Sequence, residues 1–165
     1  MGGGLGLGPV ARATHALAAN ARGVQPVVIV GKNRRLERRL IEQARRDDSD
    51  VRVLGFVDNV FDWMHAADVL ITKPGGLTTS EALAAGVPLF LLPPLPGQEE
   101  RNVRYLTGSG AALRVATPGE LAASLDAVLD GRPAVRRLRE RADALRHPDA
   151  ADRIAARIEA LGRPA

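Results

Sequence analysis

The sequence has 165 residues, which suits a single domain of ordinary size. Its hydrophobic share of 45% is enough for a sizeable core, and because only 3% of residues are aromatic, aliphatic side chains must fill most of that core. The absence of cysteine excludes disulfides, thiolate metal sites and a cysteine nucleophile. The net charge is +4. The arginines alternate with acids as on a solvated helix face, and this outweighs the nucleic-acid or anionic-membrane interpretation of a pI near 10.5.

Short apolar runs alternate with helical patterns from residue 25 onward. The expected strands cover residues 25–31, 51–54, 68–72, 87–92 and 111–115. The expected helices cover residues 34–46, 58–66, 79–85, 98–107 and 119–130, and stretches near 133–146 and 149–161. Strands that alternate with helices form βαβ units, and apolar runs without alternation are typical of strands buried on both faces. The sequence therefore predicts an α/β fold with a Rossmann-like, doubly wound parallel sheet.

The chain begins with a loop that contains Gly2, Gly3, Gly4, Gly6 and Gly8, followed by Pro9. Pro9 suits the first turn of a helix. Glycines let backbone N–H groups approach an anion closely, and the helix that follows adds its positive end, so the loop suits a diphosphate. A flexible tail or a tight strand–helix turn would have the same composition. Since such a loop normally follows a strand, we expect that a first strand of the sheet is missing from this chain.

The most specific motif runs from Thr72 to Ala82, between an expected strand and an expected helix. Open α/β sheets bind ligands at this edge, beyond the carboxyl ends of their strands. Gly75 and Gly76 allow close backbone approach, and Leu77 and Thr78 follow them at the start of the helix. Glu81 suits the two hydroxyls of a ribose. The alternative is a capping box formed by Thr78 and Glu81, although a cap does not require the preceding glycines.

Two further strand ends carry candidate binding groups. Gln98 and Glu99 begin an expected helix and suit sugar hydroxyls, although an ordinary acidic first turn has the same pattern. After another strand, Phe56 offers apolar packing and the backbone near Val57 can pair with the edge of a base. The three histidines are scattered without metal-ligand spacing, so we predict no metal site.

Together these loops resemble the C-terminal domain of GT-B glycosyltransferases. The resemblance is strongest to processive diacylglycerol glycosyltransferases and monogalactosyldiacylglycerol synthases, relatives of the transferase that adds N-acetylglucosamine to lipid I. It covers about residues 1–115. The matching segments are Met1 to Gly6, Gly55 to Val57, Ala67-Asp68, Thr72 to Thr78, Ser80 to Ala82, Gly86 to Pro88, and Pro96 to Asn102.

The resemblance implies a fold that is one half of GT-B and a role in holding a UDP-hexose. Gly3 and Gly4 would face the diphosphate, helped by the helix start at Gly75, Gly76, Leu77 and Thr78. Phe56 and Val57 would line the uracil site, Glu81 would hold the ribose, and Gln98 and Glu99 would face the donor hexose. The family needs no bound metal or other cofactor, because helix ends and backbone amides neutralise the leaving UDP.

The resemblance also implies hexose transfer to a lipid acceptor such as diacylglycerol. Such a protein is cytoplasmic, with peripheral association at the inner face of the cell membrane. We expect residues 1–165 to form the donor-binding domain alone. The N-terminal domain, which would bind the acceptor and supply a general base, is absent, so no residue here is predicted to be catalytic and the chain alone is expected to be inactive.

There are four alternatives to this function. The chain could be a non-catalytic nucleotide-sugar-binding module, or the donor subunit of a two-chain glycosyltransferase. A non-hydrolysing sugar-nucleotide epimerase shares the architecture, but its motifs are not seen. Binding of nucleic acid is opposed by the low aromatic content and the lack of a recognised motif.

Overall fold

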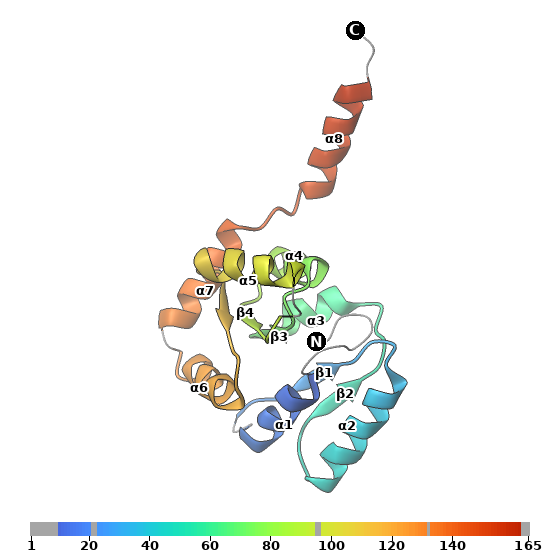
Figure 1. Cartoon of the computed structure of the whole chain (residues 1–165), viewed down its shortest axis with the longest axis vertical. Coiled ribbons are helices and arrows are strands. Elements are labelled where there is room, and N and C mark those ends of the chain that lie inside the picture. Colours follow the sequence, from blue (N-terminus) through green and yellow to red (C-terminus); the bar gives the residue numbers. More distant parts are fainter. Residues whose placement is uncertain (1–9, 21–22, 95–96, 132, 163–165) are drawn as a thin grey trace.

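The computed structural model describes residues 10–162 apart from residues 21–22, 95–96 and 132. Helices and strands alternate along most of the chain (Figure 1). The helices are α1 (Val10–Asn20), α2 (Arg34–Arg46), α3 (Val60–Ala66), α4 (Gly76–Ala85), α5 (Gln98–Gly108), α6 (Pro118–Leu129), α7 (Pro133–Ala144) and α8 (Ala150–Gly162). The strands are β1 (Val27–Ile29), β2 (Arg52–Leu54), β3 (Leu70–Thr72), β4 (Leu89–Leu91) and β5 (Ala112–Arg114). This order confirms the expected α/β class.

All strand pairings in the described part of the chain are parallel, as predicted. The strands form two groups, a pair in the order β1-β2 and a three-stranded sheet in the order β3-β4-β5. The sequence predicts one sheet with longer strands, so the division is a difference. Within the described residues, β1 pairs with β2, and β4 pairs with both β3 and β5, and no pairing joins the two groups.

Strand β4 explains why helices cover both faces of the three-stranded sheet. Its successive side chains point to opposite faces, as in any strand. Leu89 and Leu91 pack in a cluster with residues of α3, α4 and α5. Phe90 packs in a second cluster with residues of α1 and α6. Because all three side chains are completely buried, this strand lies at the centre of the core.

Helix α1 links the two groups of strands. Val10 packs in the cluster that contains Val28 and Val30 beside β2 and α2. Ala16 and Leu17, further along the same helix, pack in the cluster of β4, β5 and α6. Side chains of one short helix therefore belong to both cores, which holds the two sheets together.

Local signals set the bounds of several helices. The side chain of Asn33 caps α2 by accepting a hydrogen bond from the Leu36 N–H, and Thr117 caps α6 in the same way. Gly86 ends α4 with φ of 69°, which confirms the predicted stop at this glycine. Helix α8 extends away from the other elements, and no described residue in it is buried (Figure 1). Within the described ranges, no helix is both long and apolar enough to cross a bilayer.

Candidate functional site

The loops with candidate binding groups lie at the carboxyl ends of the strands. Because β3, β4 and β5 run parallel, the loops after them meet at one edge of their sheet. The loops after β1 and β2 likewise share one edge of the two-stranded sheet. In both sheets the loops lie at the carboxyl ends of the strands, which is where open α/β sheets bind ligands.

The loop after β3 presents the start of α4 without a side-chain cap. Gly75 is the N-cap residue, and its own N–H donates to the Lys73 carbonyl at 2.8 Å. The N–H groups of the first helical residues, Gly76 to Thr78, have no partner within a helix by geometry. A helix start of this kind carries partial positive charge and suits an anion.

The capping-box alternative for Thr78 and Glu81 is wrong. Helix α4 begins at Gly76, three residues earlier than predicted, so Thr78 lies within the first turn and cannot be the N-cap. The Thr79 hydroxyl donates to the carbonyls of Gly75 and Gly76 at 2.9 and 3.1 Å. Glu81 is exposed on the second turn of the helix. This leaves its carboxylate accessible to a ligand.

Two side-chain contacts join the loop after β3 to the start of α5. The Lys73 ammonium and Glu99 Oε1 form an ion pair at 2.6 Å. Asn102 Nδ2 donates to the Pro74 carbonyl at 2.8 Å. A Cβ atom at Gly75 would lie 3.9 Å from Lys73 Nζ and 4.0 Å from Glu99 Oε1, so the ion pair lies beside this glycine. The structure thus brings the predicted loop at Gly75 and Gly76 beside the one that begins α5.

The backbone conformation at Gly97 explains why the loop before α5 contains a glycine. Gly97 is the N-cap residue of α5 and has φ of 103° and ψ of −118°, a conformation that essentially only glycine adopts. Gln98 is the first residue of the helix, and Glu99 lies in its first turn. Gly97 therefore fixes where α5 begins and so where Glu99 meets Lys73.

The loop with Phe56 and Val57 follows β2, in the two-stranded sheet. The Phe56 side chain is 63% exposed, and the Lys32 ammonium lies 5.4 Å from its ring centroid. A Cβ atom at Gly55 would lie 2.8 Å from Glu37 Oε1, so a larger residue there would displace the end of the Glu37 side chain. Val57 is half-buried. Phe56 is thus an exposed aromatic ring beside a cation from the loop after β1.

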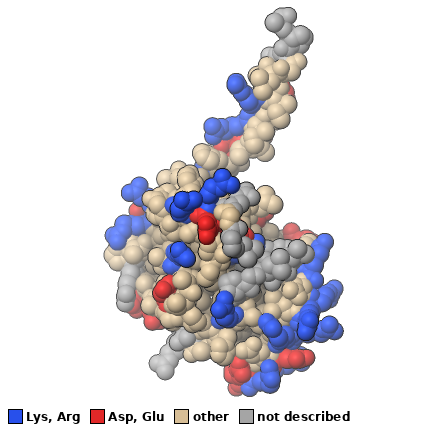
Figure 2. Space-filling view, viewed as in Figure 1, with Lys and Arg blue, Asp and Glu red and all other residues tan. Residues whose placement is uncertain are grey.

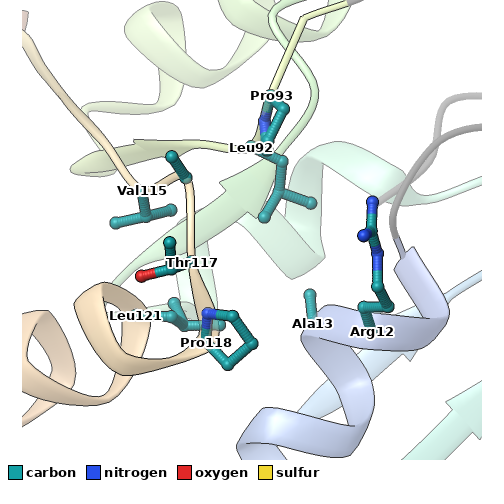
Figure 3. A pocket seen from close by; sticks show the side chains of 9 residues that line it. Arg12, Ala13, Leu92, Pro93, Val115, Thr117, Pro118 and Leu121 are labelled. Carbon is teal, nitrogen blue, oxygen red and sulfur yellow. The ribbon is translucent and has the colours of Figure 1, made fainter.

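A small cavity of about 60 Å³ lies between the start of α1, the ends of β4 and β5, and the start of α6 (Figure 3). It is lined by residues that include Arg12, Leu92, Val115 and Thr117. Drug-sized ligands occupy sites of roughly 300–1,000 Å³, so this cavity is too small for a nucleotide sugar. An open groove lies at the opposite edge of the sheet, between Gly110 and Arg141.

Some predicted residues fall outside this description. Gly3 and Gly4 lie outside the described residues, and the side chain of Gln98 is not described. Sequence reasoning assigned no role to Lys73, Asn102 or Lys32. One signal was available, since Lys32 and Lys73 are the only lysines among 23 basic residues.

Among the residues with described positions, no three histidine or acidic side chains form a group that could hold a metal.

Comparison with known proteins identifies a family. Residues 9–154 match the model of the glycosyltransferase family 28 C-terminal domain. A relative from Bacillus cereus (strain AH187), named processive diacylglycerol beta-glucosyltransferase, is 34% identical over 131 residues. The match covers 79% of this chain and 34% of the relative, so the chain spans much less than the relative's whole length.

Two solved structures share the fold. MurG from Acinetobacter baumannii has a TM-score of 0.71 at 22% identity, covering 96% of this chain and 50% of that protein. Medicago truncatula UGT71G1, complexed with UDP-glucose, has a TM-score of 0.61 at 16% identity, covering 87% and 34%. At these identities the likeness establishes the fold alone, as one part of a larger molecule. Because the family model matches nearly the whole described chain, this protein belongs to the family of glycosyltransferase family 28 C-terminal domains.

Proposed function

We propose that this domain binds a UDP-hexose, the donor of a glycosyltransferase that transfers the hexose to a lipid such as diacylglycerol. The observation that carries the proposal is the uncapped start of α4 held against the first turn of α5 by two side-chain contacts. The helix start suits a diphosphate, and the first turn of α5 brings polar groups beside it. Family membership and the name of the relative from Bacillus cereus support the reaction class.

Each part of the donor has its proposed residues. The diphosphate faces Gly3, Gly4, Gly75 and the N–H groups of Gly76, Leu77 and Thr78 at the start of α4. The uracil lies against Phe56 and Val57, and the ribose hydroxyls donate to Glu81. The hexose meets Gln98 and Glu99. Neutralisation of the leaving UDP by helix N–H groups would make a metal ion unnecessary.

The domain assignment forms part of the same proposal. Residues 1–165 are the C-terminal donor-binding domain, and the acceptor site with its general base belongs to an N-terminal domain on additional polypeptide. The support is the length comparison, since the chain covers 34% of the Bacillus cereus relative and 50% of MurG.

Calorimetric titration of the chain with UDP-glucose, ADP-glucose and GDP-glucose tests the donor site. We expect UDP-glucose to bind at least about tenfold more tightly, a difference of about 1.4 kcal/mol. Phe56→Ala should remove this preference without lowering the melting temperature, because the ring is largely exposed. Phe61→Ala, at another exposed phenylalanine, is the matched control. Equal affinity for the three nucleotides would reject the uracil site, and no binding would reject the donor site.

Peripheral association with the cytoplasmic membrane face completes the proposal, and α2 supports it. Figure 2 shows Lys and Arg side chains gathered where Figure 1 places this helix. Leu40, on the opposite face of α2, is buried in the core. Six arginines of the helix are exposed: Arg34, Arg35, Arg38, Arg39, Arg45 and Arg46. Each arginine near an anionic bilayer contributes about 1 kcal/mol of attraction.

Sedimentation with phosphatidylglycerol vesicles tests the membrane surface. We expect binding that weakens with salt and weakens further in the Arg38→Gln/Arg45→Gln variant. The matched control, Arg136→Gln/Arg139→Gln, removes two exposed arginines from α7 and should bind like the unaltered protein. Equal loss in both variants would show that net charge alone matters. Preference for nucleic acid over vesicles would contradict this part of the proposal.

A further inference from the structure

The ion pair between Lys73 and Glu99 is well shielded from solvent. The two groups lie 2.6 Å apart, and only 21% and 14% of the respective side chains are exposed. The two residues are 26 positions apart in sequence, one directly after β3 and the other in the first turn of α5. The pair therefore connects the loop after β3 directly to the start of α5.

A second contact fixes the same two segments. Asn102 lies three residues after Glu99, close to one turn further along α5, so both side chains lie on neighbouring positions of one helix face. Asn102 donates to the carbonyl of Pro74, the residue after Lys73. Helix α5 thus holds two consecutive residues of the loop that leads into Gly75.

Compared with a pair of packed apolar side chains, an ion pair of this kind adds little net stability, although removing one partner alone is costly. A carboxylate in the first turn of a helix is already stabilised by the helix dipole, so Glu99 does not need a cation to be tolerated there. Partly buried ion pairs lose in desolvation much of what they gain in Coulomb attraction. A charge-assisted hydrogen bond does, however, fix the geometry of a carboxylate.

We propose that Lys73 is a positioning residue for the donor hexose: it holds the Glu99 carboxylate, through Oε1, in the orientation that meets the sugar hydroxyls. This inference rests on the proposed function, in which Glu99 contacts the hexose. Lys73 acts through Glu99 and need not touch the nucleotide. Replacing Lys73 should therefore change the affinity for UDP-glucose and not the affinity for UDP.

The test compares the affinities of UDP and UDP-glucose by calorimetry. We expect the unaltered protein to bind UDP-glucose more tightly than UDP. In Lys73→Met the affinity for UDP stays the same, while that for UDP-glucose falls about tenfold, the scale of one hydrogen bond to a charged group. Lys32→Met, at the other lysine, is the matched control and should keep the advantage of UDP-glucose over UDP.

A double-mutant cycle shows whether Lys73 acts through Glu99. We expect Glu99→Gln to remove the advantage of UDP-glucose, and Lys73→Met to add nothing in that background. Additive losses would overturn the positioning role. Equal loss of UDP and UDP-glucose affinity in Lys73→Met would also overturn it, since that result indicates a direct phosphate contact or a collapsed loop.

The same titrations separate the inference from the proposed function. If the unaltered protein binds neither UDP nor UDP-glucose, the donor site fails and the inference falls with it. If it prefers UDP-glucose and Lys73→Met keeps that preference, the donor site stands and only the inference is overturned. Equal binding of UDP and UDP-glucose by the unaltered protein overturns the hexose contact.

Lysine-labelled protein provides a second measurement should Lys73→Met fail to fold. With two lysines in the sequence, the ¹³Cε signals of Lys32 and Lys73 can be assigned by one Lys32→Met variant. UDP-glucose should shift the Lys73 signal beyond any shift caused by UDP. A Lys73 signal that responds identically to UDP and UDP-glucose would contradict the proposal.

Discussion

The role open to the Glu81 side chain depends on where helix α4 begins. Its motif fitted both a ribose contact and a capping box, and the sequence could not distinguish them because each needs a carboxylate near a helix start. In the structure, Gly75 takes the N-cap position and Glu81 stands exposed on the next turn. The carboxylate therefore has no capping role to lose.

We predict that Glu81→Ala weakens UDP binding and leaves the melting temperature nearly unchanged. A hydrogen bond to a charged group contributes about 1.5–3 kcal/mol, or about one to two decades in affinity. Calorimetry and thermal unfolding measure the two effects, with Glu42→Ala, at an exposed glutamate of α2, as the control. A lower melting temperature with unchanged affinity would remove Glu81 from the ribose site.

At the scale of the elements, the sequence predicted the order and type of helices and strands because apolar periodicity and glycine stops are local signals. The start of α4 was misplaced by three residues, since Gly76 is a poor helix former and gives no local signal of a helix start. The contacts of Lys73 with Glu99 and of Asn102 with Pro74 were not predictable, because they join segments far apart in the chain. The roles of Phe56, Val57, Gln98 and Glu99 in donor binding stay predictions.

We predict that Gly97→Ala destabilises the protein by about 1–3 kcal/mol, the cost of holding a non-glycine residue in a sparsely populated conformation. A Cβ atom at Gly97 would meet nothing within 4 Å, so the loss comes from the backbone and not from a clash. The control is Gly119→Ala, which lies in α6 in equally open space and without a positive φ. Denaturant unfolding measures both variants. Equal stability of the two would show that the Gly97 conformation is not required.

At the scale of the whole molecule, two groups of parallel strands share α1 and expose their candidate loops at the carboxyl ends. This arrangement offers groups to hold a donor. None of the three histidines stands in these loops, since His15 lies in α1, His65 in α3, and His147 between α7 and α8. Binding and transfer should therefore separate experimentally.

We predict that the isolated chain transfers no hexose from UDP-glucose or UDP-galactose to diacylglycerol. Loss of a positioned general base removes about two to four decades of rate, and loss of the acceptor site also removes the advantage of proximity. Activity should appear when the chain is joined to, or mixed with, an N-terminal acceptor domain. A radiolabelled transfer assay in diacylglycerol micelles measures this. Continued inactivity of the two-domain protein would favour a non-catalytic binding module, and robust glycolipid formation by the chain alone would contradict the domain assignment.

The central claim, that the donor binds at the carboxyl ends of the strands, is tested most directly by mapping backbone amide NMR shifts during titration with UDP-glucose. The largest shifts should occur at Gly76, Leu77 and Thr78 in the first turn of α4 and at Glu99 in α5. The groove between Gly110 and Arg141, at the opposite edge of the sheet, is the internal control and should be unaffected. Shifts centred on that groove, or no shifts at α4, would contradict the account.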